Sequence, residues 1–96
     1  MHELSSEKDE LADFVGHEVV LDTRGELIYI GKLAAVRDWF LELQQADVHD
    51  LQETRTSKEL YIMESAKHGI RTNREKVLVR KREVVSLSKL SDVTQY

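Results

Sequence analysis

The clearest pattern of apolar and polar positions lies in residues 14–43. Two runs rich in Val, Leu and Ile, His17–Thr23 and Glu26–Ala35, are separated by the turn Thr23-Arg24-Gly25. Short apolar runs bounded by turn residues are typical of strands. A third run follows directly, and we predict three consecutive antiparallel strands within residues 17–47.

The third run alternates Trp39, Leu41 and Leu43 with the side chains between them. This period of two predicts a strand with one buried face and one partly wet face. Gly31 interrupts the second run, and a glycine inside an otherwise good strand favours a bulge or a sharp bend. The pattern therefore predicts a sheet that curls into a small barrel.

A short helix is predicted before the strands, over Leu4–Val15. Ser5 or Ser6 can cap its first turn, which also carries acidic residues that the helix dipole favours. Gly16 follows as the expected C-terminal stop. A helix this short is marginal without tertiary contacts, so we expect it to cover one end of the barrel.

The segment after the third strand is expected to be a helical insertion. Ala46–Thr56 is polar and turn-like, and Thr56-Ser57-Lys58-Glu59 matches a capping box with Thr56 as the N-cap. These signals predict a helix over about Ser57–His68. A short strand over Glu59–Glu64 fits the same residues, and the sequence leaves that alternative open.

The last apolar runs indicate a hairpin that could close the barrel. Val77–Val79 and Val84–Leu87 flank Arg80–Glu83, and four residues are within the usual length of a hairpin loop. The tail Ser88–Tyr96 is polar enough to be partly disordered.

A chain of 96 residues has room for one domain, because domains commonly contain about 100 to 150 residues. Such a chain buries only about 60 to 65% of its surface, so a partner would add stability. The expected segments are a helix in 4–15, strands in 17–47, an insertion in 48–75, two strands in 76–91 and a tail in 92–96.

The composition excludes several kinds of site. There is no cysteine, which excludes disulfides and thiolate metal sites. No apolar run approaches the roughly 18 residues that a membrane span needs, and the first ten residues are polar and acidic. We expect a soluble cytoplasmic protein that does not contact a membrane.

The net charge of −4 is unevenly distributed. Residues 1–64 carry 15 acidic and 6 basic side chains, a net charge of −9. Residues 65–96 carry 3 acidic and 8 basic side chains, a net charge of +5. Such an uneven distribution of charge fits either a phosphate-binding face or self-assembly of acidic against basic surfaces. Charge alone does not decide between them.

Asp47, His49 and Asp50 form the one local cluster that resembles metal ligands or an acid/base set. No further histidine motif accompanies them. The sequence also has no phosphate-binding glycine loop, HExxH motif or Ser-His-Asp spacing. We therefore expect no enzyme, no metal site and no cofactor.

The order of helix, bent meander, insertion and basic loop resembles the Sm-like (LSm) family of ring-forming barrels. Gly31-Lys32-Leu33 and Asp38-Trp39-Phe40 are similar to the first half of the family motif. Residues 79–85 are similar to its second half, and 11–16 resemble the entry from helix to first strand. The resemblance implies a strongly bent, five-stranded antiparallel barrel with short helices.

The resemblance also implies residue roles in binding RNA. Trp39 stands where relatives stack a base, and Asp38 where they brace the nucleotide-binding loop. Arg80 and Lys81 would hold backbone phosphate at the central pore. The chain departs from the family at Leu41, where a base-contacting Asn is expected, and at Lys81, where a Gly is expected.

Each of these residues also has a purely structural interpretation. Trp39 fits a core or subunit contact, because large aromatic residues dominate both. Arg80, Lys81 and Arg82 fit a solvated loop whose charges protect a strand edge from aggregation.

Our leading hypothesis is a homo-oligomeric ring of five to seven copies that binds single-stranded RNA. The alternative is an oligomeric structural or protein-interaction module without RNA, which Leu41, the overall acidity and the insertion favour. An SH3-like barrel that works as a monomer is a third possibility.

Overall fold

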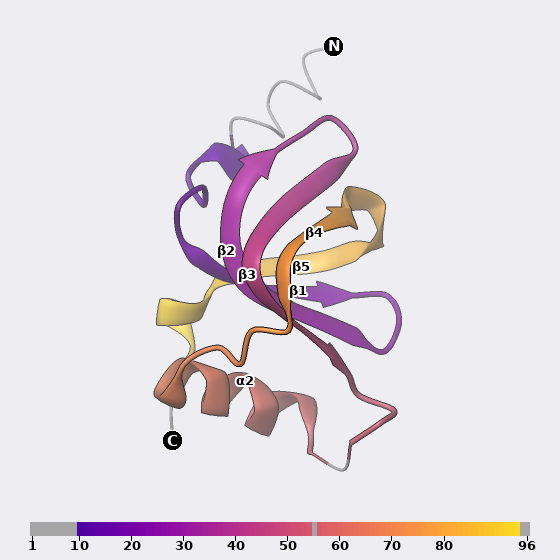
Figure 1. Cartoon of the computed structure of the whole chain (residues 1–96), viewed down its shortest axis with the longest axis vertical. Helices are drawn as coiled ribbons and strands as arrows, with labels where there is room; N and C mark the ends of the chain where they lie inside the picture. The colour runs from indigo at the N-terminus through magenta and orange to yellow at the C-terminus, as the bar shows by residue number, and fades with distance from the viewer. Residues whose placement is uncertain (1–9, 55, 95–96) are drawn as a thin grey trace.

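The computed structural model describes residues 10–54 and 56–94. Five strands form one antiparallel sheet in the order β4-β3-β2-β1-β5, and the sheet is strongly bent (Figure 1). The elements are β1 (Glu18–Thr23), β2 (Leu27–Val36), β3 (Phe40–Asp50), α2 (Lys58–His68), β4 (Arg74–Arg80), the 3-10 helix η1 (Lys81–Glu83), β5 (Val84–Lys89) and the 3-10 helix η2 (Leu90–Asp92). The predicted five-stranded, bent antiparallel fold with an insertion between strands three and four is confirmed.

Gly31 marks the bend that the sequence predicted. The register between β2 and β3 shifts between Ile30 and Lys32. A Cβ atom at Gly31 would lie 2.8 Å from the Cβ of Ala46 and 2.9 Å from its Cα, closer than real Cβ contacts. Glycine therefore allows β3 to approach β2 closely where the sheet curls.

The two strands after the insertion do not form the predicted hairpin. β4 pairs with β3 and β5 pairs with β1, so the two strands stand at opposite ends of the sheet order. Because the sheet curls, the short helix η1 is enough to carry the chain from one edge to the other (Figure 1). A loop length that suits a hairpin could not distinguish these two connections.

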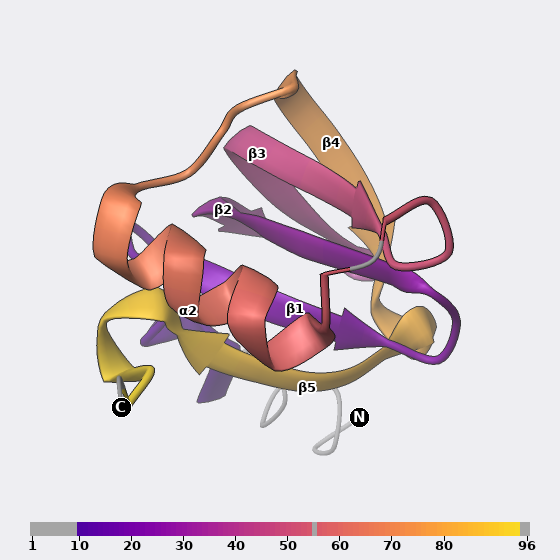
Figure 2. The ribbon, with the colours of Figure 1, turned by 90° about the horizontal axis from the view of Figure 1, so that it is seen from below.

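Two hydrophobic clusters hold the barrel together, one on each face of the bent sheet. The first contains Val19, Leu21, Leu33, Leu41, Leu43, Ala46 and Val79. The second contains Val20, Ile28, Ile30, Tyr61 and Leu90. Tyr61 belongs to α2, which therefore covers the second cluster (Figure 2). Alternate residues of β1 serve the two clusters, which explains why its Val-Val-Leu run is continuously apolar.

The insertion forms the predicted helix and not the strand alternative. Its N-cap is Ser57, one residue later than predicted, and the Ser57 hydroxyl accepts a hydrogen bond from the Leu60 amide at 3.2 Å. The helix ends before Gly69, whose φ of +96° favours glycine and whose N–H donates to the Ser65 carbonyl. The capping-box spacing was offset by one residue because Ser57 and Thr56 are both able to cap.

Three boundaries differ from the prediction. β3 continues to Asp50, because Ala46 and Asp47 are buried beside β2 and β4, so the expected turn begins later. β4 begins at Arg74, before the expected residue 76. Leu90 is only 5% exposed, so the start of the expected disordered tail is packed in the second cluster.

The N-terminal helix is described only at its end. Residues 10–12 are helical, and turns over 13–16 lead to Gly16, which has the positive φ expected of a helix stop. The predicted start of this helix and its caps Ser5 and Ser6 lie outside the described residues. Within the described ranges, no helix is long and apolar enough to cross a membrane.

Candidate functional site

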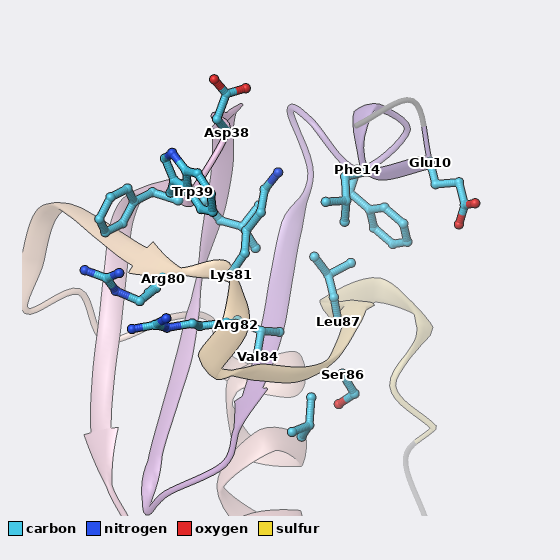
Figure 3. Close-up of a pocket in the computed structure, with 14 residues that line it drawn as sticks. Glu10, Phe14, Asp38, Trp39, Arg80, Lys81, Arg82, Val84, Ser86 and Leu87 are labelled. Atoms are coloured by element: carbon cyan, nitrogen blue, oxygen red, sulfur yellow. The ribbon is translucent and has the colours of Figure 1, made fainter. Parts of the chain in front are cut away.

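A groove of about 880 Å³ lies where the start of β3 meets the corner between β4 and β5 (Figure 3). Its lining is mostly apolar, with charged side chains around the mouth. The lining residues are Glu10, Leu11, Phe14, Asp38, Trp39, Phe40, Leu41, Arg80, Lys81, Arg82, Val84, Val85, Ser86 and Leu87. The structure therefore brings together all four residues that the sequence singled out for RNA, Asp38, Trp39, Arg80 and Lys81.

Trp39 is on the surface and not in the core. Its side chain is 72% exposed, the most exposed of the large hydrophobic residues described. It immediately precedes β3, and its carbonyl accepts a hydrogen bond from the Lys81 amide at 2.9 Å. This bond ties the loop that carries Trp39 to the first residue of η1. Most of the Trp39 ring is therefore accessible from outside the chain.

The cations of the groove come from one corner of the chain. Arg80 ends β4 opposite Phe40, and its guanidinium carbon lies 5.2 Å from the Phe40 ring centre, a cation–π contact. The guanidinium groups of Arg80 and Arg82 point the same way, whereas the Lys81 side chain points toward the loop of Asp38 (Figure 3). Positive charge is thus spread over two sides of the exposed Trp39.

An ion pair between the half-exposed Arg37 and the buried Glu42 holds the loop between β2 and β3. The Arg37 guanidinium donates a hydrogen bond to Glu42, which is 7% exposed. This bond, with help from Lys76, holds the pKa of the Glu42 carboxyl below its usual value despite burial. The Arg37 amide also donates to the Phe40 carbonyl at 2.9 Å. Asp38 and Trp39 are therefore presented by a loop that is closed at both ends.

The apolar wall of the groove includes residues that the sequence did not single out for binding. Leu11 and Phe14 come from the helical residues and the turn before β1, and Val85 and Leu87 come from β5. Phe14 and Leu87 are labelled in Figure 3. Val85 is 60% exposed. The sequence assigned Phe14 to helix packing and Val85 to a strand. Only the curl of the sheet shows that these segments face Trp39.

Helix α2 lies away from this groove. None of the groove's lining residues belongs to α2, which packs against β1 and η2 at the other end of the barrel (Figures 1 and 2). Lys58 in its first turn forms an ion pair with Asp22 of β1 at 3.0 Å. The insertion therefore leaves Trp39 and the basic corner uncovered.

In the fold, Asp47, His49 and Asp50 each make their own contacts within the chain. The Asp47 carboxylate accepts hydrogen bonds from the Tyr61 hydroxyl at 2.7 Å and from the Asn73 side-chain amide at 3.0 Å. The His49 ring stacks on Tyr61 at 3.7 Å between ring centres. Asp50 accepts from the Gln52 amide. No group of side chains in 10–54 and 56–94 is arranged to hold a metal ion.

These contacts attach α2 to the end of β3. Burial, together with the bond to Asp47, raises the pKa of the Tyr61 hydroxyl above its ordinary value, so it remains a donor. The Asn73 side chain also accepts a hydrogen bond from the Val48 amide and donates one to the Val48 carbonyl, as a paired residue of a neighbouring strand would. The polar cluster is thus a structural attachment, which the sequence could not separate from a chemical site.

No protein-family model and no curated protein sequence matches the chain. Solved structures match its fold. The Pyrococcus abyssii Sm protein in complex with a uridine heptamer has a TM-score of 0.57 and 13% identity, over 84% of this chain and 93% of that one. The P. aerophilum SmAP1 heptamer has a TM-score of 0.52 and 18% identity, over 84% and 88%.

A structure of a different kind is also similar. A chain in the NatC complex bound to CoA has a TM-score of 0.55 and 21% identity, over 82% of each chain. At these identities the likeness concerns the fold. The predicted resemblance is confirmed at that level: this chain has the Sm-like fold.

Proposed function

We propose that this protein is a ring-forming Sm-like subunit that binds single-stranded RNA in the groove around Trp39. The observation that carries the proposal is a 72% exposed tryptophan on a rigid loop beside Arg80, Lys81 and Arg82. Proteins that bind single strands combine aromatic faces for bases with cations for the backbone. The groove offers both, and α2 does not cover it.

Stacking and phosphate contacts would share the binding free energy. A base stacked on an aromatic side chain contributes about 1 to 3 kcal/mol. Each phosphate neutralised on a single strand adds a slope of about −0.7 in the dependence of log affinity on log salt. Arg80 and Lys81 hold phosphate in this proposal, and Asp38 positions the loop that presents Trp39.

The ring follows from the two ends of the sheet. β4 and β5 each pair with one neighbour only among the described strands, so each presents an unpaired edge. Leu78 of β4 is 45% exposed and Val85 of β5 is 60% exposed. Pairing β4 of one copy with β5 of the next would satisfy the backbone hydrogen bonds of both edges. Closure with five to seven copies leaves no free edge and places the basic corners around a common pore.

Oligomeric mass and RNA affinity test this proposal together. Light scattering on the purified protein is expected to give five to seven times the chain mass of 11.1 kDa. Fluorescence anisotropy with a labelled single-stranded RNA at low salt is expected to show saturable binding that weakens as salt rises. A monomer would contradict the ring, and no RNA binding at low salt would contradict the function.

A protein-interaction module is the second candidate, and one residue favours it. Leu41 is 2% exposed and apolar at the position where the family resemblance places a base-contacting Asn. The similar chain in the NatC complex shows that this fold also occurs in a protein assembly. In that case Trp39 and Val85 would contact a protein partner. An assembly of the expected mass that binds no RNA at low salt would support this candidate.

A further inference from the structure

The groove around Trp39 has no amide side chain in its lining. Its apolar members are Leu11, Phe14, Trp39, Phe40, Leu41, Val84, Val85 and Leu87. Its charged members are Glu10, Asp38, Arg80, Lys81 and Arg82. Ser86 is the one uncharged polar side chain of the lining, and no Asn or Gln is present there. Amide side chains can form paired donor and acceptor bonds with a base, and this wall has none.

The cations of the groove are already placed against other groups. The Arg80 guanidinium lies over the Phe40 ring. The Arg82 backbone is held by Arg24, whose Nε donates to the Arg82 carbonyl at 2.8 Å. Both guanidinium groups point to the side away from Phe14 and Leu87 (Figure 3). They are placed for phosphate along the rim rather than for a base in the groove.

The buried part of the groove lining next to Trp39 is apolar. Leu41 is 2% exposed and lies between Val36 of β2 and Val79 of β4 in the sheet register. A base that enters beside Trp39 therefore meets hydrocarbon on its inner edge. The binding free energy of such a base comes from the stacked area of its ring faces, and this area is larger for a purine than for a pyrimidine.

From these observations we infer that the groove selects bases by stacking area, so that it prefers purine-rich single strands over uridine-rich ones. This inference rests on the proposed function, because it concerns the same groove and its RNA. It adds the chemical class of the preferred ligand, which neither the fold nor the proposed function specifies.

The test compares oligo(A), oligo(U) and an abasic oligoribonucleotide of equal length and label. Anisotropy at about 50 mM salt gives a dissociation constant for each. We expect oligo(A) to bind about three- to tenfold more tightly than oligo(U), and the abasic strand to bind most weakly. Trp39→Ala is expected to bring the affinities of oligo(A) and oligo(U) together, whereas Trp39→Phe keeps their order with a smaller ratio.

Ser86→Ala tests whether the one uncharged polar side chain of the lining reads a base edge, and selection by stacking area predicts that the preference for oligo(A) remains. Ser88→Ala is the matched control, because Ser88 is exposed on the same strand and does not line the groove, and it is expected to leave both affinities unchanged. Tighter binding of oligo(U) than of oligo(A), or loss of the preference in Ser86→Ala, would overturn the inference and leave RNA binding intact. Equal binding of all three strands would overturn it in favour of phosphate contacts alone. If none of the three strands binds, the proposed function and the inference fail together.

Discussion

The two ends of β3 both gather aromatic and charged side chains, but in opposite surroundings. At its start, Trp39 is 72% exposed and Phe40 contacts Arg80 beside an open groove. Near its other end, Asp47 is 8% exposed and His49 is stacked on Tyr61 beneath α2. The first end presents aromatic and cationic groups outward. The second uses acidic and aromatic groups to bind another part of the same chain.

This difference indicates which of the two ends of β3 is open to a ligand. Asp47 is 8% exposed and accepts hydrogen bonds from two side chains of the same chain, so its carboxylate is engaged inside the fold. Among the described contacts Trp39 accepts a hydrogen bond through its backbone carbonyl, and its side chain is largely exposed. Asp47 and His49, which resemble metal ligands or an acid/base set in the sequence, make structural contacts. Trp39, which the sequence could also place in the core, lines the candidate binding site.

The largest expected effect is on stability, at the attached end of β3. Asp47→Ala removes the carboxylate that accepts from the Tyr61 hydroxyl and one of the two acceptors of the Asn73 amide, and we expect it to lower the free energy of unfolding by about 2 to 4 kcal/mol. Urea denaturation measures this change. Asp50→Ala is the matched control, because Asp50 bonds only the exposed Gln52 amide among the described contacts. Equal effects of the two substitutions would contradict a structural role specific to Asp47.

The next effect is on RNA affinity, at the open end. Arg80→Ala combined with Lys81→Ala is expected to weaken RNA binding about tenfold at low salt and to reduce the salt slope by about 1.4. Lys67→Ala on the outside of α2 is the control with a charge change far from the groove. Unfolding in urea shows whether each variant is folded. A salt slope that does not change would contradict phosphate binding by this corner.

A smaller effect is expected at high pH, again at the attached end. The pKa of Tyr61 is raised in the folded state, so its neutral form contributes stability below the ordinary tyrosine pKa of about 10. Above that pH the unfolded chain ionises first, and the contribution is lost as pH rises. The difference in unfolding free energy between wild type and Tyr61→Phe should shrink between about pH 9 and 11. A constant difference would show that Tyr61 ionises alike in both states.

The smallest effect is expected at low pH, in the loop that presents Trp39. The pKa of Glu42 is lowered in the folded state, mainly by Arg37, so its stabilising contribution is complete above the ordinary value of 4.5. It is lost as pH falls through the lowered value. Wild type is therefore expected to lose stability between about pH 5 and 3 more steeply than Glu42→Gln. Parallel curves for the two proteins would contradict the pair with Arg37.

The sequence predicted the strands well because their signals are local. The Val-rich runs, the bend at Gly31 and the helix after Ser57 each depend on a few neighbouring residues. The predicted hairpin between β4 and β5 was wrong, because the pairing partners of a strand depend on how the whole sheet curls. The continuation of β3 past Ala46 was missed, because Asp47 in this part of the strand is held by Tyr61 and Asn73, which are distant in sequence.

The candidate site was predicted in part, for the same physical reason. Asp38, Trp39, Arg80 and Lys81 came from resemblance to a motif, and the fold brings them to one groove. Phe14 and Val85 were not predicted to join them, because a groove wall forms only when separate segments meet. The roles of all these residues in RNA binding remain predictions.

Trp39 fluorescence during titration with single-stranded RNA is the most direct test of the central claim. Trp39 is the one tryptophan of the chain, so its emission reports on the groove alone. A base stacked on the indole ring is expected to quench this emission in a saturable way, with a midpoint that matches the anisotropy curve and moves to higher RNA concentration as salt rises. RNA that binds by anisotropy while the emission of Trp39 stays constant would contradict the assignment of the groove as the RNA site.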